Sequence, residues 1–208
     1  MTGESDDDLL RALAGGGRDA FAALFRRHHT FVYNVAFRRT ASWAAAEDVT
    51  GIVFLELWRQ RERVQPLGGS IRPWLAGVAA NQARHVWRAR SRRAAALGRL
   101  AWGGDDAASG HEADPADNVA ARIDDERAMA TLLNRLDALP EGHREVLTLW
   151  AWEQLSYDEI AVALAVPVGT VRSRLSRARA SLRTLDGTGA SLRASLGEPA
   201  RNDRGGVT

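Results

Sequence analysis

The sequence predicts an all-α protein in which two small helical domains, at 19–95 and 119–185, are joined by a flexible linker at 96–118. Apolar residues recur at helical spacing through both domains, whereas the linker is rich in Gly, Ala and Asp and has no apolar period. The 208 residues are enough for two domains that each bury a modest core. We expect flexible segments at the two ends, 1–18 and 186–208, the first with a short helix that could start at Leu9, Leu10 and Leu13 and end at the glycines 15–17.

Composition limits the classes of function. The net charge is only +2, so a nucleic-acid surface must come from how the 28 basic residues, all of them arginine, are arranged. The absence of cysteine excludes disulfides, thiolate metal sites and thiol-based redox sensing. The sequence has no long uncharged apolar run, and its N-terminus is acidic rather than signal-like, so we expect a cytoplasmic protein without membrane insertion.

The N-terminal domain is predicted to contain three helices, at about 19–41, 44–63 and 71–93. In the second of these, the expected buried face consists of Val49, Ile52, Val53 and Leu57, and it can include Trp58. The opposite face carries Glu56, Arg59 and Gln60, which suit a protein partner or water, and the sequence alone favours water. In the first helix, the adjacent His28 and His29 point apart and cannot bind one metal ion together, so we expect a structural or surface role.

The end of the third helix combines arginines with aromatic rings in the run NQARHVWRARSRR, which begins at Asn81. Such a surface suits single-stranded nucleic acid, because the charges follow the backbone and the rings stack on bases. The alternative is a solvated helix end, where the helix dipole favours cations. From these residues alone the two interpretations are equally supported.

The C-terminal domain begins with predicted helices at 119–139 and 142–154. The expected inward residues are Ile123, Met129, Leu132, Leu133, Leu136, Val146, Leu147, Leu149 and Trp150.

A tight pair of helices follows at 155–185. Ser156 and Glu159 can form a capping box at the start of the first helix. Pro167 cannot continue that helix but can begin the next, in which Val171, Leu175 and Ala178 form an apolar stripe. Two short amphipathic helices joined by so tight a turn predict a helix-turn-helix.

The outward face of the second helix predicts DNA binding. It carries Arg172, Ser173, Ser176 and Arg177, with Arg174 and Arg179 at its flanks. Arginine can contact guanine edges or phosphate, and serine can contact bases or the backbone. The alternative, a solvated basic face, is disfavoured because cap, turn, core stripe and one-sided charge all agree.

No pattern in the sequence predicts catalysis. There is no Gly-rich phosphate loop, no nucleophile elbow and no His-Glu zinc spacing. We therefore expect a protein that is not an enzyme and has no catalytic residue, metal or cofactor.

The C-terminal domain resembles region 4 of the sigma-70 family of RNA polymerase sigma factors, of the small extracytoplasmic-function (ECF) type. The residues that carry the resemblance are LPE at 139–141, REVL at 144–147, LSYDEIA at 155–161 and PVGTVRSRLSRAR at 167–179. The N-terminal domain resembles region 2 through AED at 46–48, FL at 54–55, WR at 58–59, WL at 74–75, VA at 78–79 and Asn81. The linker stands where larger family members carry a third domain.

The resemblance implies a sigma factor that binds core RNA polymerase, directs it to promoters through the −35 and −10 elements, and assists promoter melting. It implies that Arg172, Ser173, Ser176 and Arg177 contact the −35 duplex, with Arg174 and Arg179 beside them. It implies that the single-stranded −10 element is held by Asn81, Arg84, Trp87 and Arg88.

For partners, the resemblance implies the clamp helices and the flap of core RNA polymerase, promoter DNA, and an anti-sigma factor. The residues facing the polymerase would be Asp48, Glu56, Arg59 and Gln60. One departure falls in this helix, because Gly51-Ile52 stands where many family members have a Gln-Glu pair.

Two other function classes remain as alternatives. A stand-alone helix-turn-helix regulator would use its N-terminal domain for dimerisation or ligand sensing, and would have no use for the arginine-rich end of the third helix. An enzyme acting on nucleic acid would need a carboxylate or metal cluster, whereas the acidic residues here lie mostly in the linker, the tail and helix caps.

Overall fold

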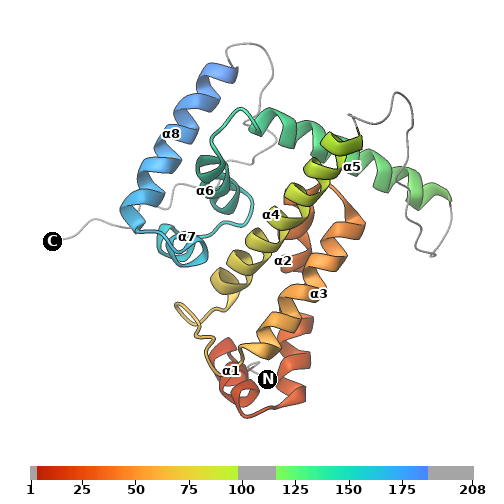
Figure 1. The fold of residues 1–208 in the computed structure, drawn as a ribbon. Helices are drawn as coiled ribbons and strands as arrows, with labels where there is room; N and C mark the ends of the chain where they lie inside the picture. Colours follow the sequence, from red (N-terminus) through yellow and green to blue (C-terminus); the bar gives the residue numbers. More distant parts are fainter. Residues whose placement is uncertain (1–3, 98–115, 187–208) are drawn as a thin grey trace. The chain divides into compact units, whose positions relative to one another are not determined.

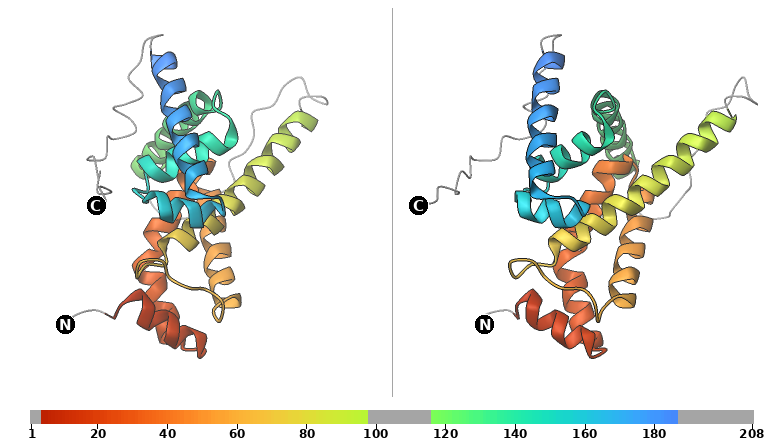
Figure 2. Two further views of the ribbon diagram at one scale, coloured as in Figure 1. Left: turned by 90° about the vertical axis from the view of Figure 1, so that its left-hand side faces the viewer. Right: turned by 60° about the vertical axis from the view of Figure 1, so that its left-hand side comes forward.

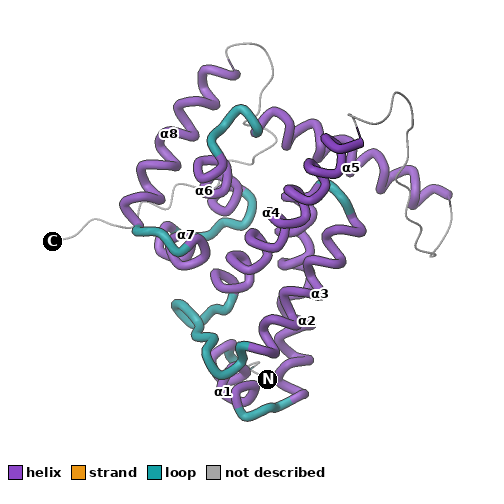
Figure 3. The backbone as a smooth tube through the Cα atoms, in the orientation of Figure 1, coloured by secondary structure: helices purple, strands orange, loops and turns teal. Residues whose placement is uncertain are grey.

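The computed structural model describes residues 4–97 and 116–186, and Figure 1 labels their helices. Within these ranges the secondary structure is helical, without a β-strand, and Figure 3 shows the short loops between the helices. The helices are α1 (Asp6–Ala14), α2 (Arg18–Thr40), α3 (Trp43–Arg59), α4 (Arg72–Leu97), α5 (Ala116–Leu136), α6 (Glu141–Ala151), α7 (Tyr157–Leu164) and α8 (Val168–Asp186). The all-α prediction is confirmed.

The chain forms two compact units, one ending at Arg135 and the other beginning at Leu136. In the N-terminal unit α2, α3 and α4 pack against one another, and α1 packs on α2. The core of this unit contains Leu13, Leu24, Val32, Val53, Leu57, Ile71 and Leu75, all fully or almost fully buried. Figure 2 shows α4 as one continuous helix.

The expectation of a flexible N-terminus at 1–18 is wrong for the residues described, because α1 belongs to the folded unit. Ser5 and Asp8 form a capping box, and Leu9, Leu10 and Leu13 are buried in the core. The three consecutive aspartates suggested a solvated segment. In the structure Asp6 turns inward to an ion pair, while the other two lie at the positive end of the helix dipole.

Two apolar residues expected inside are exposed. Ile52 on α3 is 41% exposed, and Ile123 on α5 is 42% exposed. The spacing of apolar residues in the sequence was compatible with a buried or an exposed position for both. In each helix a different side packs against the rest of the unit. On α3 the packed side is formed by Val49, Val53 and Leu57, as expected, together with Ala46, Thr50 and Phe54.

The C-terminal unit consists of α6, α7 and α8, with α8 packed on both of the others. Its core contains Val146, Leu147, Leu149, Ile160, Val171, Leu175 and Ala178. Trp150, expected to point inward, is half-buried.

Helix α5 differs from the expected domain boundary, since its residues up to Arg135 are grouped with the N-terminal unit. Glu126 accepts a hydrogen bond from the backbone N–H of Trp43 at 2.6 Å, and the Trp43 indole donates to the carbonyl of Arg122 at 3.2 Å. These contacts join α5 to the start of α3. The linker prediction falls mainly on 98–115, and the tail prediction on 187–208, both of which lie outside the described residues.

Candidate nucleic-acid interface

The first helix of the helix-turn-helix begins and ends as its sequence predicts. Ser156 Oγ accepts from the N–H of Glu159 at 3.3 Å, and the Ser156 N–H donates to Glu159 Oε2 at 2.8 Å. Ala165 ends the helix in the left-handed region at φ 51°, and the N–H of Val166 donates to the carbonyl of Ala161 at 3.0 Å. The capping box is confirmed, and the left-handed residue reverses the chain within a few positions.

Helix α8 then begins directly after Pro167, whose carbonyl accepts from the N–H of Thr170 at 2.8 Å and of Val171 at 3.2 Å. Proline needs no partner for an N–H at this position. Val171, Leu175 and Ala178 are buried against α6 and α7, which fixes the rotation of α8 about its axis.

This rotation leaves four polar side chains exposed on one face of α8. They are Arg172, Ser173, Ser176 and Arg177, the residues expected to contact the −35 element. Ser173 Oγ donates to the carbonyl of Thr170 at 3.1 Å, which leaves the lone pairs of the hydroxyl for another donor. The face is polar, basic and open to a ligand.

Arg174 and Arg179 are placed differently, because both are half-buried against α6. The Arg179 guanidinium lies 4.0 Å from the centre of the Trp150 ring, in a cation–π contact. The Arg174 guanidinium lies over Gly142, where an added Cβ would be only 3.0 Å from Arg174 Cζ. The geometry therefore favours a supporting role for these two arginines, a role that the sequence pattern did not indicate.

The residues expected to hold the −10 element lie on α4. Asn81 is exposed and Arg84 is half-buried, one turn apart on the helix. Trp87 and Arg88 belong to the same helix, but their side chains lie outside the described part of the structure.

The expected polymerase-facing residues lie on α3 and at its C-terminal end. Asp48, Arg59 and Gln60 are exposed and Glu56 is half-buried. Arg59 Nη1 lies 3.9 Å from Glu56 Oε2, and the Gln60 side-chain amide also donates to the Glu56 carboxylate.

The outward side of α3 also carries an apolar surface that sequence reasoning missed. Ile52 and Leu55 are 41% and 47% exposed, and a Cβ added at Gly51 would meet no atom within 4 Å. The helical periodicity assigned Ile52 to the core. Gly51, the neighbouring residue, was the feature of the sequence that could have indicated an exposed surface here.

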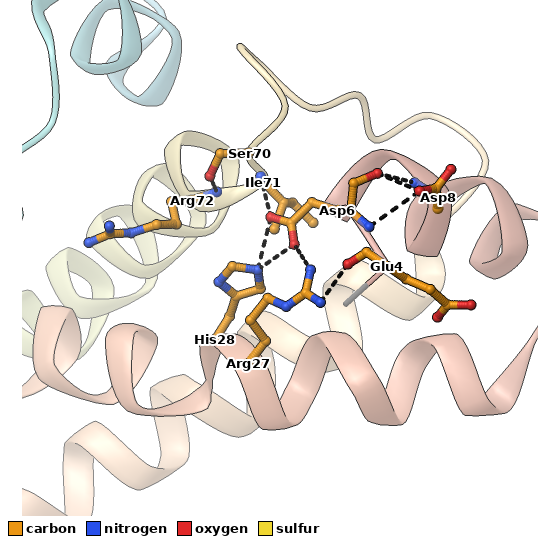
Figure 4. A network of polar contacts seen from close by, with 9 residues as sticks. Glu4, Asp6, Asp8, Arg27, His28, Ser70, Ile71 and Arg72 are labelled. Carbon is orange, nitrogen blue, oxygen red and sulfur yellow. Dashed lines mark hydrogen bonds and ion pairs between the residues drawn. The ribbon is translucent and has the colours of Figure 1, made fainter. Parts of the chain in front are cut away.

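A buried polar group on α1 was also missed (Figure 4). The Asp6 carboxylate accepts from the backbone N–H of Ile71 at 3.0 Å and from Arg27 Nη1 at 2.7 Å, and His28 Nε2 lies 2.9 Å from Asp6 Oδ2. Burial alone would raise the pKa of Asp6, but these three partners together hold its pKa below the ordinary aspartate value. His28, expected to be structural or superficial, is buried in this group.

Within the described ranges no cluster of acidic, histidine or cysteine side chains could hold a metal ion. No helix in the same ranges is long and apolar enough to cross a membrane.

Comparison with known proteins decides the family. The family model "Sigma-70 region 2" matches residues 24–93, and the model "Sigma-70, region 4" matches residues 129–182. The ECF RNA polymerase sigma factor SigK of Mycolicibacterium vanbaalenii is 32% identical over 171 residues, which cover 81% of this chain and 83% of that protein. The chain belongs to the sigma-70 family, in its ECF group. It is a sigma factor of transcription initiation.

A second relative is longer than this sigma factor. The ECF sigma factor SigE of Mycolicibacterium smegmatis is 35% identical over 163 residues, which cover 77% of this chain but only 59% of that protein. Among solved structures, CnrH in complex with the cytosolic domain of CnrY has a TM-score of 0.64 at 25% identity, covering 90% of this chain and all of that one.

Proposed function

We propose that this sigma factor binds core RNA polymerase through the exposed side of α3, contacts the −35 element as duplex through α8, and holds the single-stranded −10 element on α4. The observation that carries the proposal is the exposure of Arg172, Ser173, Ser176 and Arg177 on one face of α8, the second helix of the helix-turn-helix. A face of this composition at the N-terminal half of a second helix suits major-groove contact.

The −10 assignment is supported by the exposure of Asn81 beside Arg84 on α4. An exposed amide can donate to and accept from the edge of an unpaired base, and arginine can bind phosphate. Melting costs base stacking, and capture of an extruded base offsets part of that cost. RNA polymerase, rather than this chain, would carry out the chemistry of RNA synthesis.

The polymerase assignment is supported by a mixed surface on α3. Ile52 and Leu55 supply apolar area, while Asp48 and Arg59 supply charges at its edge. Such a mixture of apolar centre and polar rim is typical of protein interfaces. The polymerase surfaces concerned would be the clamp helices, and the flap for the C-terminal unit.

The proposal places the protein in the cytoplasm, with a protein inhibitor as a further partner. The complex of CnrH with the cytosolic domain of CnrY supports the expectation of an anti-sigma factor, because CnrH resembles this chain in fold and at 25% of aligned positions.

The polymerase is expected to turn two weak DNA contacts into one strong one. Each unit contacts DNA through few side chains, and fixing their spacing on the polymerase makes the second contact intramolecular. We therefore expect the full chain alone to bind promoter DNA at least about a hundredfold more weakly than the chain with core polymerase.

The test begins by selecting DNA from a randomised duplex library with the full chain and core polymerase. Affinity for the selected DNA is then measured by fluorescence anisotropy, with and without core polymerase. Tight binding only with core, and a selected sequence with two elements, supports the proposal. Equally tight binding by the chain alone would favour the stand-alone regulator instead.

A further inference from the structure

We propose that Asp6 is a positioning residue for promoter recognition, because it fixes the loop and the first turn that lead into α4. The surface so positioned is the part of α4 that would hold the −10 element. This inference rests on the proposed function and adds helix α1 to the machinery of −10 recognition.

Asp6 joins three elements that are distant in the sequence (Figure 4). It belongs to α1, its partners Arg27 and His28 belong to α2, and its third partner is the backbone N–H of Ile71, directly before α4. Its side chain is only 7% exposed. One buried carboxylate thus connects the start of α4 to α1 and α2.

The position of this carboxylate suits the start of a helix. The Ile71 carbonyl accepts from the N–H of Leu75 at 3.1 Å, so Ile71 stands at the cap of α4. The first N–H groups of a helix lack partners within it and carry the positive end of its dipole. A buried anion at this point supplies both a hydrogen-bond acceptor and the favourable charge.

The loop before Ile71 is shaped by two glycines and lies against α1. Leu67 and Ser70 exchange backbone hydrogen bonds of 2.9 and 3.1 Å around Gly68 and Gly69, whose φ values of 59° and 79° are left-handed. A Cβ added at Gly69 would lie 3.7 Å from the Asp7 carboxylate. The first turn of α1 therefore lies close to the loop, and the Asp6 carboxylate holds Ile71, the residue between the loop and α4.

The position of the first turn of α4 determines where the proposed DNA-binding residues of the same helix lie. Asn81 lies ten residues beyond Ile71, about 15 Å along a rigid helix. A change in the position of the first turn of α4 therefore moves Asn81 and Arg84 together. A pocket for an extruded base tolerates displacements of only about 0.5 Å, so base discrimination should be lost before folding is.

The test compares Asp6→Asn with Asp7→Asn, the same change at the next residue of the same helix turn. Within the described chain, the Asp7 side chain has no hydrogen bond or ion pair. Each full-length variant is bound to core polymerase and titrated with the selected promoter and with versions changed at single −10 or −35 positions.

We expect Asp6→Asn to reduce the preference for the correct −10 base about tenfold, as loss of a charge-assisted hydrogen bond implies. Its −35 preference and its affinity for core polymerase should stay as in the wild type, and Asp7→Asn should change none of the three.

Two further measurements keep the outcome clear. Hydrogen exchange of the amides at 71–75 should accelerate in Asp6→Asn but not in Asp7→Asn. Gly69→Ala strains the same loop from its other side, because alanine disfavours a φ of 79°, and should reduce the −10 preference in the same way. Gly69→Ala decides the question if circular dichroism shows that Asp6→Asn does not fold.

Three results would contradict the inference. One is an unchanged −10 preference in a folded Asp6→Asn, or in Gly69→Ala where Asp6→Asn does not fold. Another is a parallel loss of −10 preference, −35 preference and core binding, which would mean that Asp6 serves stability alone. The last is a wild-type complex that does not discriminate −10 bases at all, which would instead overturn the proposed function itself.

Discussion

At the scale of the residue, arginines of one helix take different roles according to the face on which they lie. Arg172 and Arg177 project from α8 into solvent, whereas Arg179 stacks on Trp150 and Arg174 covers Gly142. Burial of apolar neighbours determines this division, since Val171, Leu175 and Ala178 fix the rotation of the helix. Charge alone therefore does not identify the residues that contact DNA.

The stack of Arg179 on Trp150 predicts an energetic coupling between α8 and α6. In a double-mutant cycle of Arg179→Gln and Trp150→Ala, we expect a coupling of about 0.5–2 kcal/mol in the free energy of unfolding. The measurement is urea denaturation of the full chain, followed by circular dichroism. Arg183→Gln, at an exposed position on the same helix, should show no coupling to Trp150→Ala. A coupling of zero for Arg179 would mean that the stacking contributes nothing to stability.

The Asp6 group predicts a dependence of stability on pH. Because the folded state lowers the pKa of Asp6, the resulting stabilisation is complete above its unfolded pKa of about 4 and is lost as the pH falls through the folded value. The advantage of wild type over Asp6→Asn should therefore shrink as the pH falls from about 5 to about 3. Urea unfolding at several pH values measures it. An advantage that grows as the pH falls through this range would contradict the assigned direction of the pKa shift of Asp6.

At the scale of the element, the outward side of α3 is an exposed apolar surface. The space beside Gly51 is open, and the Ile52 side chain is exposed, on the helix proposed to bind polymerase. Apolar area of this kind contributes to binding only when a partner covers it.

We expect Ile52→Asp to weaken binding to core polymerase about tenfold or more, because it replaces apolar area with a charge that the complex would bury. Its effect on the stability of the free chain should stay within about 0.5 kcal/mol, as for other surface changes. Ile123→Asp, the same change at a position that is 42% exposed on α5, is the matched control. Binding is measured by anisotropy of the labelled full chain titrated with core polymerase. Equal affinities for wild type and Ile52→Asp would exclude this surface from the interface.

The elements that the sequence predicted well depend on local chemistry. The capping box of Ser156 and Glu159 spans three residues, and the stripe from Val171 to Ala178 follows the helical period, so both are visible without tertiary structure. A short helix near Leu9 was expected, but its place in the folded unit was missed, because the contact that anchors it joins Asp6 to Ile71, 65 residues away. Ile52 was wrongly assigned to the core because it lies at the edge of the apolar stripe. Helical periodicity allows a residue at that edge to be either buried or exposed.

At the scale of the whole molecule, two compact units carry separate candidate surfaces. The N-terminal unit holds the α3 and α4 surfaces, and the C-terminal unit holds the α8 surface. Separate units allow the spacing of the two DNA contacts to be set by a partner rather than by the chain itself. Separate candidate surfaces on two units are expected of a polymerase subunit that recognises promoters, more than of a regulator that binds DNA alone.

The central claim is that exposed residues of α8 direct RNA polymerase to its promoters. The most direct test is run-off transcription with core polymerase from the same organism, a genomic promoter library, and either the wild-type chain, Arg177→Ala or Arg183→Ala. We predict promoter-specific transcripts with wild type, a loss of about 5- to 150-fold with Arg177→Ala, and a small, uniform loss with Arg183→Ala. Transcripts that depend on the wild-type chain but are equally abundant with Arg177→Ala would contradict the assignment of the −35 surface. An absence of transcripts together with tight duplex binding by the chain alone would contradict the proposed mode of action.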